Sequence, residues 1–454
     1  MSGIATIARA ASAIAIAAEV RAGRVSAQAL CAAAFARIDA LGPQRSGFTR
    51  LLRRRALLRA AEVDARVAAG GDPGPLAGVP FGAADMFDVI GEVTTLGSAA
   101  RIAAPFSARD ARAITLLEGA GAVLIGTQAI DEIGYGFVTM NARTGTVPNP
   151  WDETRVAGGA CGGSAVAVAR GLVPFSLAFD TNGSLRVPAA LCGVIGLKPT
   201  HGDMPQAGCF PLVESLDVVG VLARDLDDVA LLRDILREGR ADRPAAEAPL
   251  RYGRLASWFD SNIAEEMRAP LNKAWSALGR ISFELAHAEV ARAAASVIIA
   301  AEAASLHRAA LEADPLAFEP AVRDRLLAGL ILPADDYLRA QRFRNWIRTA
   351  LADRFGLCDV LFTPAAPGFA PTIADPVMQF NGAPIPARSH LGIYTQPISL
   401  IGLPALVLPL AGDFAMPLGI QLIAAPGQEA TLFAAARDLV ARGVCAVPGV
   451  VEEG

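Results

Sequence analysis

The sequence predicts an α/β protein whose central β-sheet is buried on both faces. Strand-length apolar runs alternate with helical stretches and with turns rich in glycine and proline, a pattern typical of such sheets. Examples of these runs are Ala122–Ile125, Leu172–Ala178 and Cys192–Leu197. Hydrophobic residues make up 53% of the 454 residues and charged residues 19%, so the chain can build a large core. We therefore expect a large sheet covered by helices on both faces.

The order of the elements divides the chain into four segments. Residues 1–70 carry apolar residues at helical spacing from position 5 onward, and the breaker Gly70–Pro75 ends this pattern. Residues 71–224 hold the strand-length runs, residues 225–355 form a helical insertion on the substrate side, and residues 356–454 return to strands. The helices expected in the insertion are Asp225–Arg237, Ala264–Leu285, Val290–Glu312 and Asp335–Arg354. The strands expected after it are Val360–Thr363, Ala405–Pro409 and Gly419–Ile423, with a final helix over Glu429–Arg442. Because the insertion interrupts one sheet, residues 1–454 are expected to form a single domain.

Charge and composition argue against several classes of function. The net charge is −4, and the one basic cluster, Arg53–Arg55, lies in a helical pattern, so we expect no nucleic-acid binding. Six scattered cysteines and four histidines show no metal-binding spacing, so we expect no metal and no cofactor. No stretch approaches about 20 uninterrupted apolar residues, so no membrane span is expected. The apolar start, Ile4–Ala18, contains Arg9 and favours an amphipathic helix over a signal peptide. Free thiols fit a cytoplasmic protein.

Two glycine-rich turns in residues 149–202 carry the chemistry. They are Gly158–Gly163 and Asn182–Ser184, joined by a long apolar stretch. Dense glycines let backbone N–H groups converge on one point, which is how an oxyanion hole forms without side chains. The glycines fit neither the G-x-x-x-x-G-K-[ST] phosphate loop nor the G-x-G-x-x-G fingerprint. The alternative is that the glycines serve only tight turns and close packing.

These motifs resemble the amidase signature. The family pattern runs from G-G-S-S-G-G-S through T-D-x-G-G-S-I-R-x-P to C-G-x-x-G-x-K-P-T-x-G. Further similar segments are Gly78–Asp85, Thr94–Ser98, Thr363–Ala365, Gln396–Pro397, Gly402–Pro404 and Pro417–Gln421. The resemblance covers about three quarters of the chain and implies a large mixed sheet. Asn182–Ser184 and Gly208–Leu216 look closest to the carboxybiuret-hydrolase-like and urethanase-like branch.

The resemblance also implies a Ser–cis-Ser–Lys triad, of which this chain keeps one member. The nucleophile falls on Ser184, but the lysine position is Ala84 and the cis-serine position is Ala160. The implied oxyanion donors are the backbone N–H groups of Thr181, Asn182, Gly183 and Ser184, and the implied substrate contacts are Gly159, Cys161 and Tyr135. A serine hydroxyl needs a base to attack an amide, and losing one member of such a unit costs on the order of 10⁴–10⁶ in rate. We therefore expect hydrolysis by this chain to be impaired.

Other residues near the motifs are poor substitutes for the implied lysine and cis-serine. Cys161 lies beside the lost relay, although a cysteine in a glycine-rich turn is more often a packed residue. His201 fits a surface loop, and Lys198 belongs to the structural K-P-T motif. Asp85 and Asp180 are expected either to orient backbone around the site or to hold ordinary turns.

Two explanations and two functions remain open from the sequence. The alanines can reflect natural loss of activity or deliberate substitution, and codons 84 and 160 of the gene distinguish these origins. The first function is hydrolysis of a small amide, urea-like or carbamate C–N bond through an acyl-enzyme. The second is a non-catalytic binding or partner-stabilising subunit. The partners considered are a small-molecule substrate, a second copy of the chain, and a small helical subunit.

Overall fold

A central sheet of eleven strands organises the computed structural model, which describes residues 7, 9–241, 243–247, 249–279 and 281–451. The strand order is β1-β3-β2-β6-β8-β7-β14-β15-β11-β9-β10, with both parallel and antiparallel pairs. The strands of this sheet are β1 Phe48–Leu51, β2 Pro80–Ala84, β3 Val123–Gln128, β6 Phe175–Phe179, β7 Ile195–Lys198, β8 Val219–Ala223, β9 Tyr252–Ala256, β10 Ile281–Glu284, β11 Val360–Pro364, β14 Ala405–Pro409 and β15 Gly419–Ile423. Two small hairpins lie outside it: β4 Met140–Asn141 with β5 Gly145–Thr146, and β12 Val377–Phe380 with β13 Ala383–Pro386. The expected large mixed sheet is confirmed.

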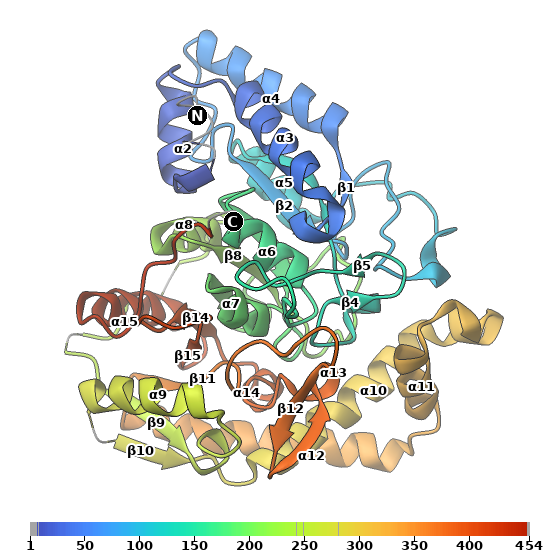
Figure 1. Cartoon of the computed structure of the whole chain (residues 1–454), viewed down its shortest axis with the longest axis vertical. Helices are drawn as coiled ribbons and strands as arrows, with labels where there is room; N and C mark the ends of the chain where they lie inside the picture. The colour runs from blue at the N-terminus through green and yellow to red at the C-terminus, as the bar shows by residue number, and fades with distance from the viewer. Residues whose placement is uncertain (1–6, 8, 242, 248, 280, 452–454) are drawn as a thin grey trace.

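Helices cover both faces of the sheet and both ends of the molecule. They are α2 Ala13–Arg21, α3 Ala27–Ser46, α4 Arg53–Ala68, α5 Arg112–Gly119, α6 Gly162–Ala169, α7 Arg186–Cys192, α8 Leu226–Leu236, α9 Glu265–Leu278, α10 Ala288–Ala313, α11 Pro320–Leu330, α12 Ala334–Ala352, α13 Ala387–His390, α14 Gln396–Ile401 and α15 Glu429–Ala441. Helices α6 and α7 pack together on one face, and α8 packs with α5 and α15 on the other. Helices α2–α4 lie at one end of the long axis and α9–α12 at the opposite end (Figure 1).

The two halves of the sequence occupy the two halves of the sheet. The six strands from β1 to β7 come from residues 48–223, and the remaining five come from residues 252–423. They meet at a single antiparallel seam, in which β14 pairs with β7 from Ala405 opposite Lys198 to Val407 opposite Gly196. Within the sheet, the two halves of the sequence therefore join through this one strand pairing.

Most predicted elements are confirmed, with two corrections. The strands Ala405–Pro409 and Gly419–Ile423 match β14 and β15, and the helix expected over 225–237 is α8, capped by the Asp225 carboxylate. The expected helix Ala264–Leu285 is wrong beyond α9, because Gly279 (φ 116°) ends that helix and the next residues form β10. Residues 225–355 are thus not purely helical, since β9 and β10 extend the sheet.

The second correction concerns the helical N-terminal segment. It contains a strand, β1, which pairs antiparallel with β3 at the edge of the sheet. The four residues of β1 follow Gly47, whose left-handed backbone (φ 75°) ends helix α3. Part of the first helix predicted over Ile4–Ala18 lies outside the described residues.

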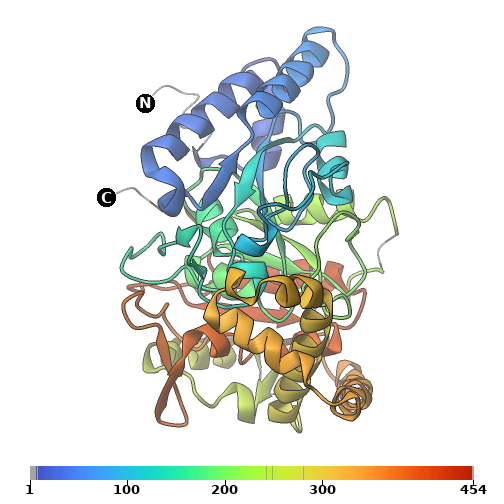
Figure 2. The ribbon, with the colours of Figure 1, turned by 90° about the vertical axis from the view of Figure 1, so that its right-hand side faces the viewer.

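Three helices of the insertion pack together, with α11 and α12 each against α10. Figure 2 shows α10, α11 and α12 together at the end opposite the N-terminal helices. Helix α10 is long and apolar enough, by length and composition alone, to cross a membrane. It contacts α11, α12 and α14, and 44% of its most apolar window is buried inside the molecule.

Candidate active site

The turn that carries Ser184 follows strand β6 and is held by a buried ion pair. The Asp180 carboxylate accepts the Gly183 N–H (2.7 Å) and binds the Arg186 guanidinium (Nε to Oδ2 2.9 Å), with both side chains fully buried. Burial would raise the pKa of Asp180, but the charge of Arg186 outweighs it and the pKa is lowered. Gly183 has φ 126°, and a Cβ there would overlap the Thr395 hydroxyl. Asp180 therefore fixes the turn, as one of the two expectations had it.

Three backbone N–H groups of this turn donate no hydrogen bond among the described residues. The N–H groups of Thr181, Asn182 and Ser184 have no acceptor among the described residues, whereas Gly183 donates to Asp180. Of the four predicted oxyanion donors, Gly183 is therefore already committed. Buried amides are almost always paired. Three neighbouring unpaired donors beside a serine hydroxyl suit the stabilisation of a developing oxyanion.

A second buried carboxylate, Asp217, holds the same turn through hydrogen bonds. It accepts hydrogen bonds from the Thr181 hydroxyl (2.6 Å) and from the N–H groups of Leu212 (2.8 Å) and Val213 (2.9 Å). Burial raises the pKa of Asp217 to about 7, against the lowering effect of these bonds. No local sequence pattern marks Asp217 as a site residue, because its role depends on a contact between positions about 36 residues apart.

The first glycine-rich turn lies directly against the Ser184 turn. The Cys161 N–H donates to the Ser184 carbonyl oxygen (3.0 Å), and the Ala160 carbonyl accepts the Asp131 N–H (3.0 Å). Gly158 and Gly159 have φ values of 81° and 59°, and a Cβ on Gly159 would overlap Pro188. The structure therefore brings the predicted cis-serine position, Ala160, beside the predicted nucleophile.

Ala84 lies at the carboxyl end of β2, at the same edge of the sheet. Strand β2 runs parallel to β6, so both strands deliver their following turns to one edge. Ala84 is fully buried and pairs with Gln128 on β3. The Gln128 side chain lies against Gly82 and donates to the Ser176 hydroxyl (2.9 Å), while its carbonyl oxygen is buried without a partner among the described residues.

Asp85, the residue after Ala84, holds the turn that follows β2. Its carboxylate accepts hydrogen bonds from the Thr95 hydroxyl and from the backbone N–H groups of Thr95 and Gly97.

No side chain among the described residues hydrogen-bonds the Ser184 hydroxyl, so none is placed as the base that the resemblance implies at position 84. The chain has two lysines: Lys273 on α9, and Lys198 on β7, which is separated from β6 by β8. The Cys161 thiol lies 3.5 Å from the Phe179 carbonyl, and burial raises its pKa to about 12, so it is protonated at neutral pH. His201 lies in an exposed loop, as expected.

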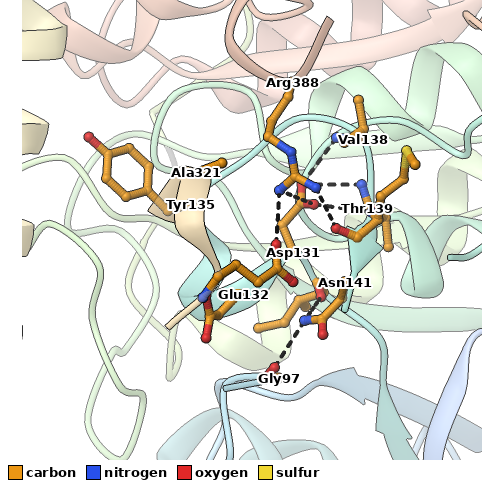
Figure 3. A network of polar contacts seen from close by, with 12 residues as sticks. Gly97, Asp131, Glu132, Tyr135, Val138, Thr139, Asn141, Ala321 and Arg388 are labelled. Carbon is orange, nitrogen blue, oxygen red and sulfur yellow. Dashed lines mark hydrogen bonds and ion pairs between the residues drawn. The ribbon is translucent and has the colours of Figure 1, made fainter. Parts of the chain in front are cut away.

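A loop over residues 129–141 shapes the space in front of the two turns. The Asp131 carboxylate accepts the N–H groups of Val138, Thr139 and Met140 (each 3.1 Å) and lies 3.6 Å from Arg388 (Figure 3). Burial raises the pKa of Asp131 to about 6. The Thr139 hydroxyl donates to the Gly159 carbonyl (2.6 Å), which joins this loop to the first turn. Tyr135 projects away from the network (Figure 3).

A small cavity of about 160 Å³ opens beside the Ser184 turn. Asn182 and Tyr135 line it, so two of the predicted site residues meet there, whereas Gly159 and Cys161 are not among its lining residues. Cys161 is fully buried. Among the described residues, no three His, Cys, Asp or Glu side chains gather where they could hold a metal ion.

A model of the amidase family matches residues 29–433. The chain belongs to the amidase family. It is 39% identical over 443 residues to AtzE of Pseudomonas sp. (strain ADP), a component of 1-carboxybiuret hydrolase, covering 94% of this chain and 97% of the relative. It is 35% identical to a glutamyl-tRNA(Gln) amidotransferase subunit of Chloroflexus aggregans (strain MD-66 / DSM 9485), covering 90% and 92%.

The fold of this amidase-family chain also matches solved structures. One is described as an unexpected vestigial protein complex that reveals the evolutionary origins of an s-triazine catabolic enzyme. It shares 38% identity with this chain, with a TM-score of 0.91, and 96% of this chain and 99% of that chain are covered. The resemblance to amidase-signature hydrolases is thereby confirmed, and the scaffold is that of enzymes that act on C–N bonds.

Proposed function

We propose that this chain binds a small amide, urea-like or carbamate molecule against Ser184 but hydrolyses it poorly. The observation that carries the proposal is the contrast between two parts of the site. Ser184 and three unengaged amide donors are in place, while the two positions that would move its proton are buried alanines. Alanine neither accepts nor relays a proton.

The expected chemistry follows from this contrast. A substrate carbonyl bound at the Thr181–Ser184 turn would be polarised by backbone N–H donors. Ser184 would lose its proton and attack the carbonyl to form a tetrahedral intermediate. Collapse of the intermediate would break the C–N bond, release the amine with that proton and leave an acyl-enzyme, which water would hydrolyse. Without a base at position 84 or a relay at position 160, the Ser184 proton has no hydrogen-bond acceptor among the described residues, so we expect the attack to be slow. Binding does not need that proton transfer and is expected to persist.

The second candidate is a non-catalytic subunit in the cytoplasm that binds a small molecule or stabilises a partner. It is supported by relatives that are themselves named as subunits of larger enzymes. A second copy of the chain or a small helical subunit would be the partner, and six free cysteines suit a reducing compartment.

The decisive experiment restores the proton-transfer residues. The double variant Ala84→Lys with Ala160→Ser should hydrolyse at least one member of a panel of amides, carbamates and esters at least ~10³-fold faster than the present chain. Adding Ser184→Ala to this variant should remove the gain, and each single substitution is the matched control. Hydrolysis at background across the panel, in a folded double variant, would count against the hydrolase scaffold and favour the subunit role.

A further inference from the structure

The cavity beside Asn182 carries positive charge and no negative charge. Two arginines line it, Arg292 from α10 and Arg325 from α11, and no Asp or Glu is among its lining residues. Its remaining walls are apolar or neutral, such as Phe137, Leu212 and Gln396. A volume of about 160 Å³ is well below that of a drug-sized pocket, so the cavity suits a small ligand.

Neither arginine has a carboxylate partner within salt-bridge distance among the described residues. Many other arginines of the chain do, including Arg186 and Arg55. Burial lowers the pKa of both Arg292 and Arg325, so keeping the charges there is costly. The nearest acidic groups act at longer range: Glu289 on Arg292, and Asp131 with Glu319 on Arg325. Asp131 and Glu319 are themselves shared with Arg388.

Both guanidinium groups are fixed in orientation by neutral partners. Arg292 donates through Nε to the Gln396 side chain (2.8 Å) and through Nη2 to the Ser389 carbonyl. Arg325 stacks 3.9 Å over the Tyr135 ring and donates to the carbonyls of Tyr135 and Ala321. In each group Nη1 has no acceptor among the described residues. A planar guanidinium held in this way is prepared to bind a carboxylate.

We propose that this cavity binds the carboxylate of a small anionic amide between Arg292 and Arg325, with its amide carbonyl toward the Asn182–Ser184 turn. The inference rests on the proposed function, because it assumes that the turn receives the amide. It narrows the substrate class to short molecules with one carboxylate and one amide or carbamate group. Neutral amides of the same size should bind more weakly, since they leave both guanidinium charges uncompensated.

The test compares matched ligands by titration calorimetry on the full chain. Succinamate carries one carboxylate and one amide, succinamide carries two amides, and succinate carries two carboxylates. We expect succinamate to bind at least about 10-fold more tightly than succinamide. Arg292→Gln and Arg325→Gln should each weaken succinamate binding about 10- to 100-fold and leave succinamide unchanged. Arg339→Gln, which removes the same charge from a side chain that is 70% exposed on α12, should change neither ligand.

A conservative variant separates charge from folding. Arg292→Lys should retain most of the affinity for succinamate, because it keeps the cation in the cavity. Equal affinity for succinamate and succinamide would overturn the anion site while leaving amide binding intact. Succinate binding as tightly as succinamate would keep the anion site and count against amide binding at the turn. Absence of binding by all three ligands would overturn both.

Discussion

At the scale of single residues, the proposed site combines backbone groups that would bind the substrate with two alanine positions where proton-transfer side chains are implied. The binding groups are mostly backbone N–H donors, which are present whatever side chain the residue carries. They are positioned by buried carboxylates, Asp180 and Asp217, that hold the turn from behind. The proton-transfer groups that the family resemblance implies are side chains, and the two positions that would carry them hold alanine in this chain. Ala84 and Ala160 are both fully buried within an intact scaffold.

Lys198 gives a residue-scale prediction about pH. Burial lowers its pKa from 10.5 to about 7, helped by Arg186 and opposed by Asp180 and Glu429. In the unfolded chain the lysine stays protonated up to about pH 10.5, so between pH 7 and 10.5 the unfolded state binds more protons. The destabilisation from Lys198 is therefore greatest below pH 7 and fades as the pH rises through that window.

The measurement is urea unfolding of the present chain and of Lys198→Met between pH 6.5 and 10. The free energy of unfolding of the present chain should rise relative to the variant by roughly 2–4 kcal/mol across this range. Other titrating groups cancel in the difference. A difference between the two proteins that stays constant with pH would show that Lys198 titrates normally.

At the scale of elements, the packing of α10 on α11 positions the cavity. Gly329 on α11 lies so close to the Ala300 carbonyl on α10 that a Cβ would overlap it. The glycine therefore lets the two helices approach, and Arg292 and Arg325 lie on these same helices. Their separation depends on that approach.

Gly329→Ala should lower the free energy of unfolding by about 1–3 kcal/mol, because the helices must move apart. It should also weaken succinamate binding, since Arg325 moves with α11. Gly356→Ala is the matched control, because a Cβ there has no atom within 4 Å. Chemical denaturation and calorimetry measure the two effects. A stable Gly329→Ala protein with unchanged affinity would show that the helix contact does not set the arginine positions.

The sequence predicts elements well where one local pattern dominates. β14 is a continuous apolar run that follows Pro404, β15 is an apolar run interrupted by Gln421 that begins at Gly419, and α8 begins at an aspartate cap. Their bounds therefore follow from local chemistry. β1 and β10 have four residues each and owe their strand conformation to pairing with distant strands. The Ser184 turn can be predicted from its sequence motif. Arg292, Arg325, Asp217 and Arg388 are not, because tertiary packing alone brings them to the site.

At the scale of the whole molecule, the two half-sheets depend on each other. The cavity takes Asn182 and Tyr135 from the first half and Arg292 and Gln396 from the second. Buried bonds also cross between the halves, since Arg186 donates to the Gln421 side chain (2.8 Å) and to the Thr395 carbonyl (3.2 Å). The site therefore forms only when both halves are assembled.

A cut in the exposed stretch Glu238–Ala241, which follows α8, tests this dependence. We expect a chain cleaved there to keep both fragments together on size-exclusion chromatography and to bind succinamate as the intact chain does. The β7–β14 seam and the buried Arg186 bonds should hold the fragments without a covalent link. Separation of the fragments under native conditions would contradict this view of the seam.

The β7–β14 seam also has a consequence for the nascent chain during translation. Ala405 leaves the ribosome about 200 residues after its partner Lys198, a delay on the order of 10–40 s at ordinary rates of translation. During that interval the first six strands can pair among themselves, but β7 presents an unpaired apolar edge. Ribosome-associated chaperones that shield such an edge should therefore engage this polypeptide between the synthesis of β7 and that of β14. Selective profiling of chaperone-bound ribosomes would show occupancy rising after codon 198 and falling once β14 has emerged.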